Sequence, residues 1–113
     1  MSEIKIGNDI VFLPRFRTKF EKISKKVYSK NELKEKSMEK LAGIFALKES
    51  CLKALGLSPG SWLSIEVKRA SSGKPQITLE RDIGKKIVSQ DCSLSHDGDY
   101  VIAQVAFLLK KED

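Results

Sequence analysis

MEKLAGIFALKESCLKAL, the sequence of residues 38–55, is the longest run of helical periodicity in the chain, and Gly56 follows it as a typical stop signal. Five apolar residues share one face of this segment: Leu41, Ile44, Phe45, Leu52 and Leu55. From residue 41 to residue 47 the segment is apolar on almost every side, which is typical of a helix enclosed by the rest of its fold. We therefore predict a long central helix over 38–55.

The flanking sequence favours strands and shorter helices. Residues 4–11 alternate apolar and polar side chains and then become apolar, which indicates a strand that enters the core. A helix is predicted from Pro14, and Ser29 and Glu32 form a capping-box pattern for another helix start. Downstream we predict a hairpin of two strands, a short helix, a strand, and a final strand that is covered on both sides: 62–70 with 75–80, 82–89, 92–95 and 100–109. Because helices and strands do not alternate regularly, the predicted class is α+β, a compact antiparallel sheet with a long central helix.

Length and composition predict one globular domain over residues 1–113. The chain is 41% apolar with only 7 Gly and 3 Pro, which excludes disordered and collagen-like proteins. Two cysteines, Cys51 and Cys92, are too few for a disulfide scaffold and allow at most one bridge, and we expect free thiols and a cytoplasmic location. We see no signal peptide and no membrane-spanning run, and therefore expect no membrane partner.

The excess positive charge lies in one quarter of the chain. Of 21 basic and 15 acidic residues, ten basic and four acidic ones fall in 15–40, which accounts for the whole net charge of +6. A basic stripe of the predicted helix runs beside its apolar stripe: Arg15, Lys19, Lys22 and Lys26. One interpretation is an ordinary solvated face, and the other is a docking face for an acidic partner. Nucleic acid is not favoured, because no aromatic residues are interleaved with these cations on one sheet face.

Four charged residues interrupt apolar patterns and are candidates for chemistry. Lys48 lies near the middle of the apolar stripe of the central helix, while Glu49 and Lys53 lie four residues apart at its edge. They form either a simple helical ion pair or part of a site. Asp9 similarly interrupts the first strand, shortly after Gly7, and is either a local turn device or a ligand. Asp9 and Glu49 together suit a hard cation such as Mg²⁺, which binds one or two carboxylates plus the oxygens of a substrate phosphate.

Four motifs, taken in order, resemble a known family. Gly7-Asn8-Asp9-Ile10 is similar to its Gly-x-Asp-Ile opening, Phe45-Ala46-Leu47-Lys48-Glu49 to its Phe-Ala-x-Lys-Glu helix, Gly73-Lys74-Pro75 to its turn, and Ser93-Leu94-Ser95-His96 to its closing segment. The order and spacing over residues 4–107 resemble the holo-acyl-carrier-protein synthases, the small-type phosphopantetheinyl transferases.

The resemblance implies a transfer reaction. Members of this family move the phosphopantetheine arm of coenzyme A onto a serine of an apo acyl carrier protein and release 3′,5′-ADP. By similarity, Asp9 and Glu49 hold Mg²⁺, Glu49 or a water that it orients takes the serine proton, and Lys53 contacts the pyrophosphate. The coenzyme pocket is expected to include a further set: Lys48, Gly73, Lys74, Pro75, Ser95 and His96. Arg15, Lys19 and Lys22 are expected to dock the acidic carrier, and the family implies a homotrimer with the active site between subunits.

Two positions depart from the family pattern. Ile44 stands where the family usually has a cation, and Phe12 stands where it often has Glu. A rival hypothesis from another class is a small basic module that binds RNA or an acidic protein, in which Glu49 and Lys53 form a plain helix pair. The identity of the carrier, fatty-acid or polyketide, stays open at this point.

Overall fold

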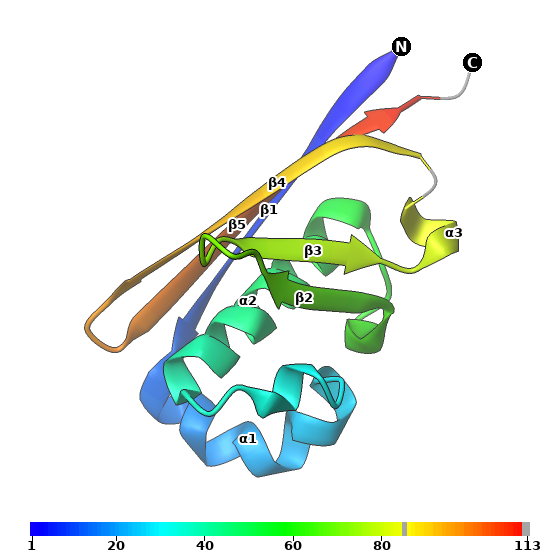
Figure 1. Ribbon diagram of the computed structural model, residues 1–113. Helices are drawn as coiled ribbons and strands as arrows, with labels where there is room; N and C mark the ends of the chain where they lie inside the picture. Colours follow the sequence, from blue (N-terminus) through cyan, green and yellow to red (C-terminus); the bar gives the residue numbers. More distant parts are fainter. Residues whose placement is uncertain (85, 112–113) are drawn as a thin grey trace.

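A long helix lies diagonally across one face of a three-stranded sheet (Figure 1). The computed structural model describes residues 1–84 and 86–111. Its elements in chain order are β1 (Ser2–Phe12), α1 (Leu13–Val27), η1 (Glu32–Lys34), α2 (Met38–Leu55), η2 (Trp62–Ser64), β2 (Ile65–Arg69), β3 (Pro75–Leu79), α3 (Arg81–Gly84), β4 (Ile87–Asp97) and β5 (Tyr100–Lys110). This mixture of helices with antiparallel sheets confirms the predicted α+β class.

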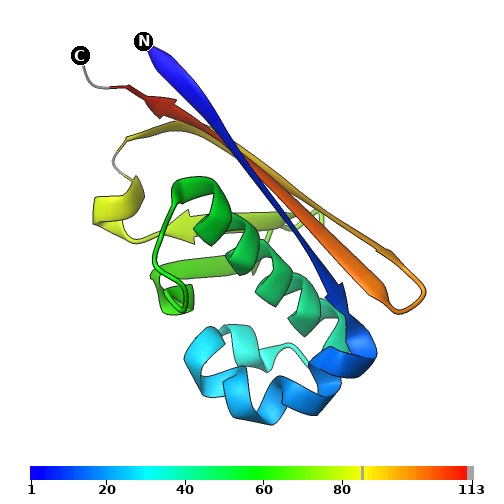
Figure 2. The ribbon, with the colours of Figure 1, turned by 180° about the vertical axis from the view of Figure 1, so that it is seen from behind.

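The strands form two separate antiparallel sheets. The larger has the order β1-β5-β4, and the smaller is the β2-β3 hairpin. Figures 1 and 2 show that the helices and the hairpin all lie on the same side of the larger sheet. The core therefore forms between this inner face of the sheet and α2.

Helix α2 confirms the predicted range of residues 38–55. The Ser37 side chain accepts a hydrogen bond from the Lys40 backbone N–H at 3.3 Å, and Gly56 ends the helix with φ of +64°. Strand β1 crosses α2 so closely that a Cβ on Gly7 would overlap the carbonyl oxygen of Ser50. This close approach brings Asp9, two residues farther along the same face of β1, next to the helix.

The prediction that the final strand is covered on both sides is wrong for a single chain. Strand β5 is central in its sheet, but only its inner residues, such as Val105 and Phe107, are buried. Within the described chain the outer side chains stay open to solvent: Ile4, Ile6, Ile10, Tyr100 and Ile102. The apolar pattern on both faces of β5 is real, but the helices of one chain cover a single face. The isoleucines of β1 that were expected in the core lie on this outer face because side chains alternate along a strand.

Other boundaries shift by a few residues. Ser29 and Glu32 make both hydrogen bonds of the predicted capping box, yet only one 3₁₀ turn follows them. The predicted strand over 62–70 begins instead with the 3₁₀ turn η2. The short helix predicted over 82–89 ends at Gly84, and Lys85 within that range lies outside the described residues. In the described part of the chain, no helix combines the length and apolar character of a membrane span.

Candidate active site

Asp9 and Glu49, separated by forty positions in sequence, line one pocket of about 210 Å³, here called the carboxylate pocket. Asp9 comes from β1 and Glu49 from the middle of α2. The Lys53 ammonium, one helical turn beyond Glu49, lies 3.0 Å from Asp9 Oδ1 and 3.1 Å from the Asn8 carbonyl oxygen. The structure therefore brings the three predicted catalytic residues together between β1 and α2.

The surroundings of Glu49 disfavour its charged form. Partial burial raises the pKa of Glu49, and the nearby Asp9 carboxylate raises it further, while Lys53 acts in the opposite direction. Two carboxylates that repel each other in one pocket favour a cation between them. Within the described residues, His, Cys, Asp and Glu form no group of three or more that could hold a metal ion. A cation here would therefore depend on these two carboxylates and on oxygens from a ligand.

Trp62 is a neighbour of Glu49 that the sequence did not reveal. Its indole N–H faces the Glu49 carboxyl and lowers the pKa of Glu49, although the two groups do not form a regular hydrogen bond. The same N–H is buried and has no other hydrogen-bond partner among the described residues. The ring packs on Phe45 with centroids 6.2 Å apart. No local pattern marks Trp62, because it lies in a turn that only the fold brings to α2.

A second pocket, of about 620 Å³, lies between the turn of the β2-β3 hairpin and strand β4, and is here called the hairpin pocket. It collects five of the residues that the resemblance assigned to the coenzyme: Gly73, Lys74, Pro75, Ser95 and His96. The two segments come together because β4 runs alongside the hairpin. This grouping could not be derived from spacing, since about twenty residues separate the two motifs.

The hairpin pocket is rich in cations. Lys74 pairs with Asp91 at 2.7 Å, which raises the pKa of Lys74 and lowers that of Asp91. His96 Nε2 lies 3.5 Å from Glu39 Oε1. Lys40 and Arg69 also line the pocket, and no sequence motif singles them out, because they lie on α2 and β2 within ordinary charged patterns. The lining carries three cations, Lys40, Arg69 and Lys74, against two carboxylates, and this excess of positive charge suits a ligand with phosphate groups.

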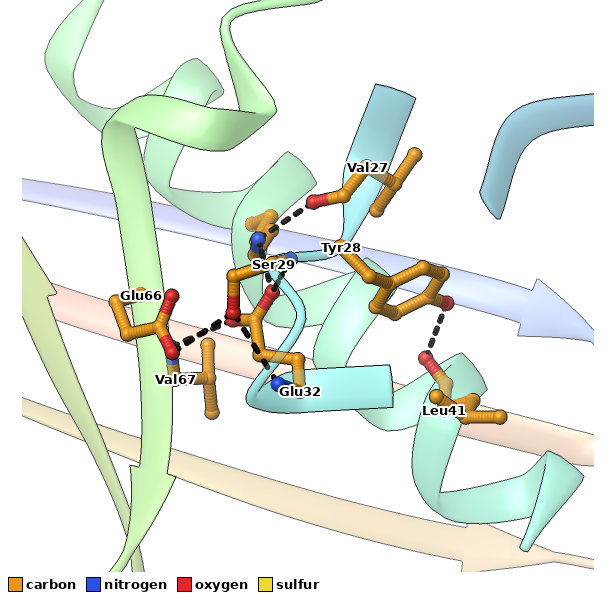
Figure 3. A network of polar contacts seen from close by, with 8 residues as sticks. Val27, Tyr28, Ser29, Glu32, Leu41, Glu66 and Val67 are labelled. Carbon is orange, nitrogen blue, oxygen red and sulfur yellow. Dashed lines mark hydrogen bonds and ion pairs between the residues drawn. The ribbon is translucent and has the colours of Figure 1, made fainter. Parts of the chain in front are cut away.

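The prediction for Lys48 is wrong. It was expected in the coenzyme pocket, but its side chain is fully buried. Its ammonium donates to Glu32 Oε1 and to the Val27 carbonyl oxygen, each at 2.6 Å. Figure 3 shows the surrounding network, in which Glu32 also accepts the backbone N–H of Val67. Lys48 therefore joins α1, η1 and α2 within the fold and does not face a pocket.

The predicted docking residues Arg15, Lys19 and Lys22 are all exposed on α1. Arg15 and Lys19 also line the carboxylate pocket, next to Asp9 and Glu49. The basic helix and the acidic pair are thus parts of one surface, a relation that the separate sequence patterns did not indicate.

The two pockets are distinct in a single chain. Among the described residues that line them, none is shared between the carboxylate pocket and the hairpin pocket. One pocket suits a cation, and the other suits phosphate groups. A reaction that uses both a cation and a phosphate ligand would require the carboxylate pocket and the hairpin pocket to face each other.

Comparisons with known proteins agree with this geometry. Residues 5–105 match the model of the 4′-phosphopantetheinyl transferase superfamily. The chain is 38% identical to a holo-[acyl-carrier-protein] synthase of Nautilia profundicola over 91% of this chain and 98% of that relative, and 30% identical to one of Finegoldia magna over 96% and 98%. Its structure is similar to the crystal structure of the Helicobacter pylori synthase in complex with coenzyme A, with a TM-score of 0.82, 33% identity, and coverage of 90% of this chain and 98% of that one. It is also similar to the Bacillus anthracis synthase in complex with CoA (3′,5′-ADP), with a TM-score of 0.81, 30% identity, and coverage of 94% and 96%.

Proposed function

The chain belongs to the 4′-phosphopantetheinyl transferase superfamily, and from this premise we propose that it is a holo-acyl-carrier-protein synthase. It transfers the 4′-phosphopantetheine arm of coenzyme A to a serine of an apo acyl carrier protein and releases 3′,5′-ADP. The observation that carries this function is the family match over residues 5–105, together with solved relatives that bind coenzyme A. Residues 1–113 act as one transferase domain.

The hairpin pocket is the proposed coenzyme site. Lys74 supplies positive charge and His96 an imidazole, and at Gly73, where φ is +89°, no side chain stands between the turn and a ligand. Pro75 and Ser95 complete the predicted set. Support comes from the collection of these residues in a single pocket and from the cations Lys40 and Arg69 beside them.

The residues of the carboxylate pocket fit Mg²⁺. Asp9 and Glu49 provide two carboxylates close enough for the charge on Asp9 to raise the pKa of Glu49. Mg²⁺ is commonly bound in this way, with substrate phosphate oxygens as further ligands. When bound, the ion supplies charge neutralisation at the pyrophosphate. We therefore assign Asp9 and Glu49 as its protein ligands.

The residues of this chain account for the movement of protons and charge. The serine oxygen of the carrier attacks the pyrophosphate phosphorus that bears the phosphopantetheine arm, and the bond from this phosphorus to the oxygen of 3′,5′-ADP breaks. Glu49, or a water that it orients, accepts the serine proton, a role that its raised pKa favours. Lys53 stabilises the departing phosphate. Its ammonium has three N–H donors, and among the described residues two of them bind the Asn8 carbonyl oxygen and the Asp9 carboxylate.

The basic face of α1 is the proposed carrier-docking surface. Arg15 and Lys19 border the pocket that contains Glu49, so an acidic carrier on α1 would place its serine near the proposed base. Lys22 continues the basic face one turn along the helix.

A homotrimer would bring the two pockets together. The carboxylate pocket and the hairpin pocket are separate in one chain, and the outer face of the larger sheet exposes apolar residues such as Ile6 at 66%. Exposed apolar patches of this kind typically mark protein interfaces. We place the active site between subunits, and we place the enzyme in the cytoplasm, where the free thiols of Cys51 and Cys92 persist.

The test combines mass spectrometry with calorimetry. Incubation with coenzyme A, Mg²⁺ and a candidate apo carrier protein should add one phosphopantetheine arm to the carrier. Coenzyme binding should depend on Mg²⁺ and should weaken in Asp9→Ala and Glu49→Ala. If the protein bound RNA tightly and took up no coenzyme, the proposed function would be wrong.

A further inference from the structure

The β2-β3 hairpin is attached to the larger sheet by side chains. The two sheets remain separate in the strand pairing, although β3 and β4 lie next to each other. Three consecutive residues of β4 bind the hairpin: Gln90 Nε2 donates to the Ile77 carbonyl oxygen at 2.6 Å, Asp91 pairs with Lys74 at 2.7 Å, and the Cys92 thiol donates to the Pro75 carbonyl oxygen at 3.3 Å. We call this line of contacts the β3-β4 seam.

Gln90 makes the strongest of these three contacts. The Lys74–Asp91 pair is exposed on both sides, and exposed ion pairs contribute little to stability. The Cys92 thiol is a weak donor. By contrast, the Gln90 amide binds a backbone carbonyl of a buried residue, Ile77, on the edge of β3 that β2 does not cover.

Packing alone does not hold the seam closed. A groove of about 540 Å³ runs along it and is lined by residues of both strands, among them Gln76 and Thr78 of β3. Core packing of Val67 and Ile77 holds the inner face of the hairpin, and the polar contacts that cross this groove set its distance from β4.

The same position sets the width of the hairpin pocket. One wall of this pocket is the turn at Gly73–Pro75, and the other is the segment of β4 that ends at His96. We propose that Gln90 is a positioning residue for coenzyme binding, whose amide holds the hairpin where Lys74 and His96 reach the same ligand. This inference rests on the proposed function.

The test compares two isosteric substitutions on either side of the groove. Gln90→Met removes the donor that binds Ile77, while Gln76→Met makes the same chemical change at an exposed position of β3. Loss of one hydrogen bond should weaken coenzyme A binding by about three- to tenfold in calorimetry. The KM for coenzyme A should rise to a similar extent. The melting temperature should fall only by the few degrees that one hydrogen bond contributes, while the KM for carrier protein and kcat at saturating coenzyme should match those of Gln76→Met.

Each other outcome contradicts the inference. If Gln90→Met bound coenzyme A as tightly as Gln76→Met, Gln90 would have no positioning role. A common loss of stability, kcat and affinity for both substrates would make Gln90 a purely structural residue. If the wild-type protein bound no coenzyme A, the proposed function would be wrong and this inference with it, whereas normal wild-type binding with an unaffected Gln90→Met overturns this inference alone.

Discussion

The buried Lys48–Glu32 pair is the clearest case in which one residue has a structural role despite its place in a functional motif. Both side chains are completely buried, and the ammonium is 2.6 Å from the carboxylate. Glu32 uses its remaining capacity on the backbone N–H groups of Ser29 and Val67, so the charges are well compensated. Tyr28, which packs beside this pair and donates to the Leu41 carbonyl oxygen at 2.6 Å, has its pKa raised by burial.

We predict that Lys48→Met destabilises the fold and leaves the site intact. Removing one partner of a buried ion pair leaves an uncompensated charge, which costs about 3–5 kcal/mol. Chemical denaturation should show this loss, while the folded fraction should bind coenzyme A with unchanged affinity. Lys25→Met, at an exposed position of α1, is the control and should change stability little. If Lys48→Met bound coenzyme A more weakly but was as stable as the wild type, Lys48 would be a binding residue and the prediction would be wrong.

At Glu49, function and stability should oppose each other. In the folded protein its pKa is raised above the ordinary value of 4.5, first by burial and then by Asp9. The unfolded chain thus releases this proton at lower pH, and the stability of the wild type falls as pH rises between the two pKa values.

The neutral variant Glu49→Gln should escape this loss. In metal-free buffer, its melting temperature should equal that of the wild type at pH 4 and exceed it increasingly as pH rises, with a plateau above the folded pKa. Its transferase activity should be lost. Thr18→Val, an exposed change on α1 that involves no titratable group, is the control and should show no such trend. A difference that stays constant from pH 4 to pH 8 would contradict the argument.

At the scale of elements, α1 combines two faces with different tasks. Its apolar face packs through Phe16 on Phe45 of α2, with ring centroids 5.7 Å apart, while its basic face stays in solvent. Because α1 follows β1 directly, the same helix that closes the core also borders the carboxylate pocket.

Reversing two charges on α1 should therefore affect the carrier alone. For Arg15→Glu combined with Lys19→Glu, we expect the KM for carrier protein to rise by roughly tenfold or more at low salt, with a smaller effect at high salt. Calorimetry should show unchanged coenzyme affinity. The matched control reverses Lys25 and Lys34, which do not line the carboxylate pocket. An equal loss of coenzyme binding would show that these cations do not act in docking.

At the scale of the whole molecule, a single chain has an uncovered apolar sheet face and two separate pockets. The outer face of the larger sheet exposes isoleucines, and the hairpin pocket and the carboxylate pocket share no lining residue among those described. Both features agree with an active site that forms between subunits.

A charge placed on the outer face should test this assembly. Ile102, which pairs with Ile10 across β5 and β1, is 45% exposed. Ile102→Asp should convert a trimer to monomers in sedimentation experiments, keep the circular dichroism spectrum, and abolish transfer. Leu63→Asp makes the same change at an exposed position of η2 and should remain trimeric. A wild-type protein that sediments as a monomer at micromolar concentration would contradict the proposal.

The sequence alone determined the features that depend on local signals. Helix α2 was predicted with its full range because apolar periodicity and Gly56 act within a few residues. The α+β class, the capping box at Ser29 and Glu32, and the family were confirmed as well. The assignments of Asp9, Glu49 and Lys53 as site residues stay predictions, although the structure places them side by side.

Tertiary structure decided what depends on partners far away in the chain. A lysine at position 48 of α2 is compatible with a ligand pocket or with a buried pair, and only the position of Glu32 makes it the latter. Likewise, the apolar residues on both faces of β5 do not say whether one chain or several cover these faces. Trp62 meets Glu49 only because the segment after α2 folds back on that helix. The physical reason is the same in each case: burial and charge compensation are properties of contacts, and these contacts join residues that lie many positions apart.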